Sequence, residues 1–401
     1  MTVPHPRRRA GAARPLSSAL ALLAAAALLL GPGAARAAAL DLAAEEALVI
    51  DVETGAELLS KNPDAPAPPA SMLKLMTLTM VFEALEAGRL KLSDEFLVSE
   101  KAWRMGGSKM FVKVGERVSI ENLIRGVIVL SGNDACIVLA EGLAGSEEAF
   151  AARMTDRARE LGLHSTFGNA TGWPHPDNEM TPRDLVFLAN RIITHFPEHY
   201  RYFAETDFEW GGVAQRNRNP LLYADLGADG LKTGHTEEAG YGLVGSAIRD
   251  GRRILFMIGG LPSSGARAQE SERVVNWAFR EFRNATLYKA GQPLGRAEVW
   301  MGERGTVGLT VAADALVTVP FGAAEGMTAT IRYQGPVEAP IARGDKVAEL
   351  VVESPEMAPL VLPVVASEDV ARGGYLTRLA AAAGLLIRDV AGEVQEVGDG
   401  G

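Results

Sequence analysis

The pattern of apolar and polar residues divides the chain into a mixed α/β part, an all-β part and a helical end. Residues 47–59 contain two apolar runs on either side of a Glu-Thr-Gly stretch at 53–55, which predicts a β-hairpin. We expect this hairpin to join an antiparallel sheet that has Lys232 at its edge. The other strand-like runs of that sheet are residues 229–234, 241–248 and 253–258.

Helical patterns lie between these runs. Prolines between positions 63 and 69 exclude a helix there, whereas residues 72–85 are rich in helix-forming residues. A helix should therefore begin near Ser71. Residues 118–145 predict two helices joined by a loop at 131–133.

Thr181 is followed by proline and precedes Asp184, which predicts another helix start. The glycine- and proline-rich loop before it, residues 168–178, is expected to form one wall of a cleft. A further amphipathic helix over residues 270–282 should pack on the sheet. Its inward residues are Val274, Val275, Ala278, Phe279 and Phe282.

After residue 288 the chain changes character, because short β-branched segments alternate with Gly, Pro and Asp. They predict a small all-β sandwich with strands near 307–311, 316–321, 327–333 and 347–352. The end is again helical. We divide the chain into a signal peptide, a catalytic α/β (α+β) domain, a β-sandwich and an amphipathic helix with an acidic tail. These are residues 1–37, 38–287, 288–370 and 371–401.

The net charge and its distribution along the chain exclude some classes of protein. The 401 residues carry a net charge of −10, and the first 37 contain five arginines but no acidic residue. The rest has 35 basic and 50 acidic residues, which argues against a nucleic-acid-binding protein. The same 37 residues have the arginines, the apolar run at 16–30 and the small-x-small site at 35–37 of a cleaved secretory signal. That run is shorter than the ~20 residues of a membrane span.

The C-terminal helix, near residues 376–390, has an apolar face. This face suits peripheral contact with a membrane, packing on the protein or contact with a second subunit. The acidic tail would be repelled by anionic lipid.

The candidate chemistry begins at Ser71 and Lys74, three residues apart. One helical turn places both side chains on one face. A neighbouring amine without its proton can accept the proton of a serine hydroxyl and so activate it as a nucleophile. By itself this spacing is common on helix surfaces.

Two further motifs follow in order. Ser131-Gly132-Asn133 comes after an apolar run, and Lys232-Thr233-Gly234 opens a strand. Taken singly, serine and asparagine are favoured helix caps, and a strand lysine is often solvated. Together with Ser-x-x-Lys, however, they form the motif set of penicillin-binding proteins and β-lactamases.

From residue 41 to residue 369 the chain resembles the low-molecular-mass penicillin-binding proteins that are serine-type D-alanyl-D-alanine carboxypeptidases. The resemblance implies a penicillin-recognising α/β domain, a trailing β-sandwich and an amphipathic anchor. It also implies a periplasmic enzyme that acts on peptidoglycan stem peptides ending in D-Ala-D-Ala and is inhibited by β-lactams. No cofactor or metal is expected.

The resemblance gives roles to the catalytic residues. Ser71 attacks the carbonyl and Lys74 is its base, whose pKa burial and the charge of Lys232 should lower from the usual 10.4. Ser131 relays a proton to the leaving amine, and Asn133 holds a substrate amide.

Other residues bind the substrate. Lys232 and Thr233, with Gly234 completing the motif, form the pocket for the terminal carboxylate, and Arg218 is expected to assist. The backbone N–H groups of Ser71 and His235 resemble the family's oxyanion hole.

Three rival functions stay open. A class A β-lactamase shares the fold, but its Glu-x-x-Leu-Asn motif is missing because the chain contains no Leu-Asn dipeptide. A D,D-endopeptidase acting on cross-linked peptides and a non-catalytic peptidoglycan-binding protein would retain all three motifs.

Two other patterns have structural explanations. Cys136, the only cysteine, lies on an apolar helix and is expected to be a buried thiol. His195 and His199 match the letters of a zinc motif, but Pro197 lies between them, whereas that site needs an uninterrupted helix.

Overall fold

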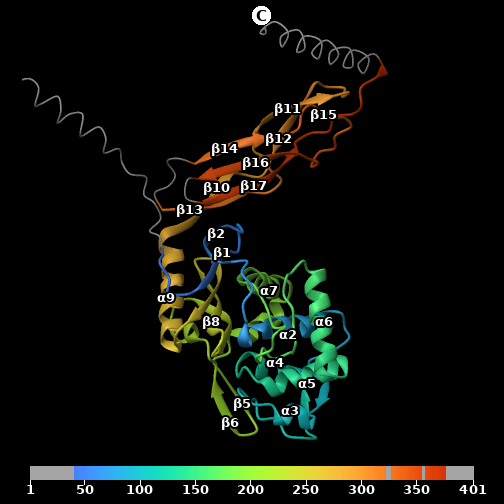
Figure 1. Cartoon of the computed structure of the whole chain (residues 1–401). Coiled ribbons are helices and arrows are strands. Elements are labelled where there is room, and N and C mark those ends of the chain that lie inside the picture. The colour runs from blue at the N-terminus through green and yellow to red at the C-terminus, as the bar shows by residue number, and fades with distance from the viewer. Residues whose placement is uncertain (1–39, 322–326, 355–356, 376–401) are drawn as a thin grey trace, which may run out of the picture.

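The computed structural model describes residues 40–321, 327–354 and 357–375, which form two parts joined end to end (Figure 1). The larger part, the α/β domain, contains an antiparallel sheet in the order β2-β1-β9-β8-β7. The sheet confirms the predicted hairpin, and β7, which carries Lys232, is an edge strand. The strands are β1 Glu46–Asp51, β2 Glu57–Lys61, β7 Ala228–Thr236, β8 Gly240–Arg249 and β9 Arg252–Leu261.

Helices cover both faces of this sheet (Figure 1). Successive strand residues point to opposite faces, so Leu243 packs with Val274 of α9 (Ser264–Glu281), whereas Val244 packs with Leu75 and the other helices. The second group is η1 Ala70–Leu73, α2 Lys74–Glu86, α4 Ile120–Ile128, α5 Asn133–Ala144, α6 Glu147–Glu160 and α7 Pro182–His195.

The helices predicted between residues 71 and 282 are confirmed, with two differences at the ends of the last one. The side chain of Thr181 caps α7 by accepting from the backbone N–H of Asp184, as expected. By contrast, α9 begins at Ser264 instead of residue 270, because Ser263 caps it there. Phe282 is buried as predicted but is the first residue of a strand, β10.

Shorter elements surround the helices. They are β3 Glu95–Leu97, α3 Glu100–Arg104, β4 Arg117–Ser119, α8 Pro197–Tyr200, η2 Arg201–Ala204, β5 Asp207–Trp210, β6 Val213–Arg216 and η3 Pro220–Tyr223.

The smaller part, the β domain, has two sheets around one apolar core. One pairs β10 (Phe282–Tyr288) with β13 (Ala315–Pro320), so residues 282–287, assigned above to the catalytic domain, pair with a strand of the β domain. The other has the order β14-β16-β17-β12-β11-β15. Its strands are β11 Gly295–Trp300, β12 Thr306–Thr310, β14 Thr328–Arg332, β15 Val337–Glu338, β16 Lys346–Ser354 and β17 Met357–Ala366.

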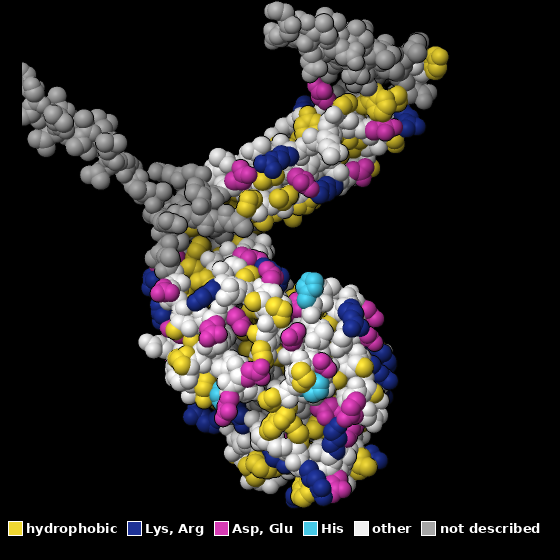
Figure 2. Space-filling view, in the orientation of Figure 1, with side chains coloured by type: hydrophobic (Ala, Val, Ile, Leu, Met, Phe, Trp, Pro, Cys, Tyr) yellow, Lys and Arg dark blue, Asp and Glu magenta, His cyan; other side chains and the backbone are white. Residues whose placement is uncertain are grey.

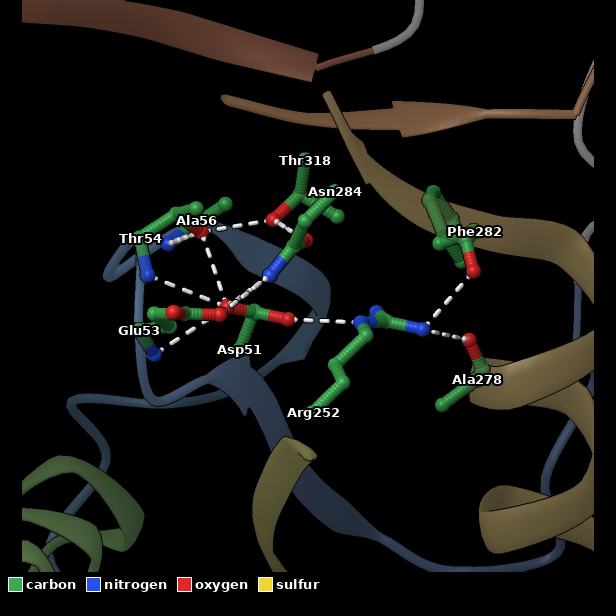
Figure 3. A network of polar contacts seen from close by, with 9 residues as sticks. All are labelled: Asp51, Glu53, Thr54, Ala56, Arg252, Ala278, Phe282, Asn284 and Thr318. Atoms are coloured by element: carbon green, nitrogen blue, oxygen red, sulfur yellow. Dashed lines mark hydrogen bonds and ion pairs between the residues drawn. The ribbon is translucent and has the colours of Figure 1, made fainter. Parts of the chain in front are cut away.

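A partly buried polar network joins the two parts (Figure 3). Asp51 at the end of β1 is fully buried, and its Oδ2 accepts from Arg252 Nε at 2.7 Å. Its Oδ1 accepts from Asn284 Nδ2 of β10 at 3.2 Å and from Thr54 Oγ1 at 3.1 Å. Thr54 in turn shares a 2.6 Å hydrogen bond with Thr318 of β13. The turn between β1 and β2 is thus bonded to both strands of the smaller sheet.

The predicted signal peptide and the C-terminal helix predicted near residues 376–390 lie outside the described residues. Within the described ranges, no helix is long and apolar enough to cross a membrane. Basic and acidic side chains are mixed over the face shown in Figure 2.

Candidate active site

Ser71 and Lys74 lie at the junction between η1 and α2. The helix starts as a 3-10 turn at Ala70, and α2 proper begins at Lys74, so the predicted start near Ser71 is confirmed. A 2.9 Å hydrogen bond joins Lys74 Nζ to Ser71 Oγ. The expected pair of nucleophile and base is therefore already in contact.

Lys74 is fully buried, and its other partners are neutral. Its Nζ donates to Asn133 Oδ1 at 2.8 Å and to the backbone oxygen of Thr171 at 2.5 Å. Burial without a carboxylate partner disfavours the ammonium form, so it lowers the pKa of Lys74 from 10.5 to about 8, with the positive charge of Arg218 acting in the same direction. Lys74 therefore loses its proton much more readily than an ordinary lysine.

A second buried lysine faces the same site. Lys232 Nζ donates to Ser131 Oγ and to the backbone oxygen of Thr233, both at 2.9 Å. Burial lowers the pKa of Lys232 well below 10.5, and repulsion by Lys74 lowers it further. Because two nearby ammonium groups repel each other, the state in which only one of Lys74 and Lys232 is positively charged is favoured.

Close packing explains two glycines of the site. A Cβ on Gly234 would lie 3.0 Å from both Met72 Cγ and the carbonyl oxygen of Pro69, because β7 packs directly against η1. Gly172, with φ +74°, lies where a side chain would overlap the carbonyl oxygen of Ala70. The close approach of β7 to the segment that carries Ser71 thus favours glycine at position 234.

Asn133 is the first residue of α5, and both of its polar atoms are engaged. Beyond its bond to Lys74, its Nδ2 donates to the carbonyl oxygen of Gly106 at 2.9 Å. The buried carboxylate of Asp134 accepts from the backbone N–H groups of Met110 and Phe111 at 2.8 Å each. These bonds hold the loop that contains Gly106, Met110 and Phe111 against α5. The sequence motifs do not indicate this positioning role of Asp134.

The residues expected to bind carboxylate form a positive region. Thr233 is buried beside Lys232, and Arg218 is hydrogen-bonded to Ser108 Oγ. Arg267 near the start of α9 was not predicted, yet its positive charge lowers the pKa of Lys232, as does that of Arg218. No local motif distinguishes Arg267, since only the packing of α9 on the sheet brings it to the site.

His235 lies on β7 with an exposed side chain. Its imidazole stacks on the ring of Tyr241, with the centroids 3.8 Å apart. The structure therefore gives the imidazole an aromatic partner on β8 and leaves only its backbone N–H for the expected oxyanion hole.

The structure explains the single cysteine and the pair of histidines that matches a zinc motif. Cys136 is fully buried, and burial raises the pKa of its thiol to about 12, so it is a poor nucleophile. His195 ends α7, whereas His199 lies on α8, so the two histidines do not share a helix. The described part of the chain contains no group of three or more metal-ligating side chains.

Comparison with known proteins agrees with this geometry. Residues 33–260 match the family described as D-alanyl-D-alanine carboxypeptidase, peptidase S11, and residues 282–372 match the penicillin-binding protein 5 C-terminal domain. The chain is 35% identical to the D-alanyl-D-alanine carboxypeptidase DacC of Escherichia coli over 341 residues, covering 83% of this chain and 85% of that one.

Solved structures give the same relationship. Penicillin-binding protein 5 from Haemophilus influenzae aligns with a TM-score of 0.76 at 31% identity, covering 83% of this chain and 99% of that one. Penicillin-binding protein D2 from Listeria monocytogenes, solved in its ampicillin-bound form, aligns with a TM-score of 0.55 at 29% identity, over 60% of this chain and 99% of that one. The chain therefore belongs to the serine-type D-alanyl-D-alanine carboxypeptidase family of penicillin-binding proteins.

Proposed function

We propose that this protein removes the terminal D-alanine from peptidoglycan stem peptides through an acyl-enzyme on Ser71. The observation that carries the proposal is the 2.9 Å contact between Ser71 Oγ and the buried Nζ of Lys74. Neutral Lys74 takes the hydroxyl proton while Ser71 Oγ bonds to the carbonyl carbon between the two D-alanines. The resulting oxyanion accepts hydrogen bonds from the backbone N–H groups of Ser71 and His235.

Collapse of this intermediate breaks the peptide bond and releases D-alanine. The leaving amine receives its proton through Ser131, whose hydroxyl is hydrogen-bonded to Lys232. Water then attacks the ester, which regenerates Ser71 and frees the shortened peptide.

Binding of the substrate carboxylate determines which of the two lysines, Lys74 or Lys232, is protonated. A carboxylate bound by Lys232, Thr233 and Arg218 stabilises the ammonium form of Lys232. Since the lysine pair favours a single positive charge, Lys74 is then the neutral member. Substrate binding thus prepares the base, while Asn133 holds both Lys74 and the loop at Gly106 and keeps one amide hydrogen for the substrate.

Mass spectrometry of the purified protein with a pentapeptide ending in D-Ala-D-Ala tests this function. We expect free D-alanine, a tetrapeptide product and a transient acyl adduct on Ser71. A cross-linked dimer peptide in the same assay distinguishes endopeptidase action. The match to the penicillin-binding protein 5 C-terminal domain favours the carboxypeptidase over a class A β-lactamase. Binding of the pentapeptide without turnover would contradict the proposal and indicate a binding protein.

We also propose that β-lactams acylate Ser71, because they present a reactive amide carbonyl and a carboxylate to the same groups. The ampicillin-bound form of the Listeria monocytogenes structure supports this. Incubation with penicillin followed by peptide mapping should find one adduct, on Ser71.

Residues 1–37 are proposed to direct export to the periplasm, and residues 374–390 to bind the membrane surface peripherally. The support is the sequence pattern of each segment. Deleting the residues after Arg372 should move the protein from the membrane to the soluble periplasmic fraction. A full-length protein that is already in the soluble fraction would contradict the membrane role.

A further inference from the structure

The hydrogen-bond partners of Lys74 Nζ determine how its neutral amine is oriented. Asn133 Oδ1 and the carbonyl oxygen of Thr171 can only accept a hydrogen bond, whereas the hydroxyl of Ser71 can also donate one. A neutral amine has two N–H groups and one lone pair. When the N–H groups donate to Asn133 and Thr171, the lone pair is left for Ser71, as the proposed function requires. The position of the two acceptors therefore matters for the base.

The carbonyl of Thr171 belongs to a loop, and the residue before it is bonded from two helices. The carbonyl oxygen of Ala170 accepts from Thr77 Oγ1 of α2 at 2.7 Å, and its N–H donates to Glu147 Oε1 of α6 at 3.2 Å. Thr77 and Ala170 are completely buried, and Glu147 is 8% exposed. The backbone that leads to Thr171 is thus held on both sides, away from solvent.

Asn169 holds the next peptide unit of the loop. Its Oδ1 accepts from the backbone N–H groups of Thr171 and Gly172 at 3.1 and 2.9 Å. The N–H of Gly172 and the carbonyl of Thr171 belong to the same peptide unit. Because this unit is planar, the bond to its N–H also fixes the direction of the carbonyl that contacts Lys74.

Glu147 is the charged residue of this arrangement. Its Oε2 lies 3.0 Å from Nζ of Lys101, a partly exposed residue of α3, while its Oε1 binds the loop. A carboxylate is costly to bury, and here the ammonium group of Lys101 and the N–H of Ala170 both stabilise it. Lys101 therefore helps to keep the Glu147 carboxylate charged in the position from which it binds the loop.

We propose that Glu147 and Thr77 are positioning residues for the acylation step. They hold the loop so that the lone pair of Lys74 is directed at Ser71. This inference rests on the proposed function, because it concerns the same step. There the hydroxyl hydrogen of Ser71 moves to Lys74 as Oγ bonds to the carbonyl carbon, and neither positioning residue exchanges a proton. Loss of either residue should slow this chemistry and leave binding of the substrate carboxylate unchanged.

Acylation by a chromogenic β-lactam separates chemistry from binding. The rate at saturation reports the chemical step, and the concentration at half-saturation reports binding. Glu147→Ala removes the acceptor for the loop N–H, and Thr77→Val removes the donor to the loop carbonyl while keeping the shape of the side chain. We expect each variant to lower the saturating rate about tenfold with an unchanged half-saturation concentration. The loss should persist well above pH 8, where Lys74 has already lost its proton.

Conservative variants distinguish positioning from folding. Glu147→Gln keeps an acceptor oxygen and Thr77→Ser keeps the hydroxyl, so both should retain most of the saturating rate. Glu147→Gln should also move the pH midpoint downward, because the negative charge of Glu147 favours the ammonium form of Lys74. Since Glu147→Ala and Thr77→Val release the same loop residue, their combined loss should be smaller than the product of the single losses.

Each positioning residue has a matched control. Glu148→Ala removes the other carboxylate bound by Lys101, at 2.7 Å, but Glu148 is exposed, and among the described residues no hydrogen bond joins it to the loop. Thr79→Val removes a buried hydroxyl of α2 that donates to the carbonyl oxygen of Leu75 in the same helix, at 2.8 Å. Both controls should be acylated at the normal rate.

Normal saturating rates in Glu147→Ala and Thr77→Val, with folding checked by circular dichroism, would overturn the inference. A loss seen only in the half-saturation concentration, or an equal loss in Glu147→Ala and Glu147→Gln, would also overturn it. Should Glu147→Ala fail to fold, the comparison of Thr77→Val with Thr77→Ser decides alone. Failure of the unmodified enzyme to be acylated at Ser71 is a different result, because it would overturn the proposed function itself.

Discussion

The catalytic cleft and the junction between the two parts both bury charged side chains, but they treat them differently. In the cleft, Lys74 has no carboxylate among its hydrogen-bond partners, and burial lowers its pKa to about 8. At the junction, the fully buried Asp51 is paired with Arg252 at 2.7 Å (Figure 3). Burying a charge is costly in both places. In the cleft, this cost disfavours the charged form of Lys74 and so gives a reactive neutral amine. At the junction, the positive charge of Arg252 offsets the cost of burying Asp51.

This comparison predicts that substitutions in the two regions separate activity from stability. A change in the cleft should remove chemistry and leave folding nearly intact. A change at the junction should do the reverse, because none of the proposed catalytic side chains belongs to the Asp51 network.

The largest effect is expected at the nucleophile. Ser71→Ala should abolish D-alanine release and penicillin labelling, because the bond-forming oxygen is gone. Lys74→Ala should retain Ser71 but slow acylation by about a hundredfold or more, the usual contribution of a general base. Stopped-flow acylation with a chromogenic β-lactam measures both.

Circular dichroism and thermal unfolding provide the control for these variants, which must remain folded. Full penicillin labelling of folded Ser71→Ala would show that another residue is the nucleophile. An unchanged acylation rate in Lys74→Ala would assign the base elsewhere.

At the junction, we expect a substitution to lower stability and to leave the acylation rate unchanged. Asp51→Ala leaves the partly buried, charged Arg252 without its carboxylate partner, which should lower the free energy of unfolding by about 3 kcal/mol. Urea unfolding measures this loss, and penicillin labelling at low temperature should show that the folded fraction reacts at the normal rate.

Glu100→Ala is the matched control for Asp51→Ala. Glu100 forms an exposed ion pair with Arg104 one helical turn away, and its removal should hardly change unfolding. A slower acylation rate in folded Asp51→Ala would contradict the independence of the two regions.

The two regions also differ in how far the sequence predicts them. Ser71, Lys74, Ser131 and Lys232 belong to short motifs whose spacing indicates their chemistry, and the structure brings them together as two hydrogen-bonded pairs. The carbonyl oxygen of Thr171 could not be predicted, because any residue supplies such an acceptor. It contacts Lys74 only because of the path of its loop.

The junction was not predicted at all, although β1, β9 and β13 were predicted as strands and only β10 was not. Asp51 and Arg252 are 201 residues apart, and they meet because β1 pairs with β9 in a particular register. The apolar pattern predicts which segments are strands, but register also depends on partner and turn geometry. Arg267 was missed for a similar reason, since its place depends on how α9 packs.

The pH dependence of acylation tests the lowered pKa of Lys74 directly. A base with a lowered pKa loses its proton at lower pH, so the rate should rise about tenfold per pH unit below the midpoint and level off above about 8. Arg218→Gln should move the midpoint upward, because it removes a positive charge that opposes protonation of Lys74. A midpoint near 10.4 in the unmodified enzyme would show that Lys74 is not desolvated.

The smallest effect is expected from Thr318→Val, which removes one hydroxyl from the junction while keeping the shape of the side chain. Thr318 Oγ1 donates to Asn284 Oδ1 at 2.9 Å and lies 2.6 Å from Thr54 Oγ1, whose single hydrogen is shared between Thr318 and Asp51. Thr54 keeps its other bond, to Asp51, so the loss falls mainly on Asn284. We expect the free energy of unfolding to fall by about 1 kcal/mol in urea, with unchanged acylation.

Thr330→Val on the exposed face of β14 removes a solvated hydroxyl and serves as the control for Thr318→Val. Calorimetry adds a sharper test, because the network couples the unfolding of the two parts. A weaker junction should let the β domain unfold at a lower temperature than the α/β domain, which separates their transitions. Equal shifts of both transitions, or equal losses in the two valine variants, would show that the Thr54–Thr318 bond does not hold the parts together and that the junction depends on the Asp51–Arg252 pair.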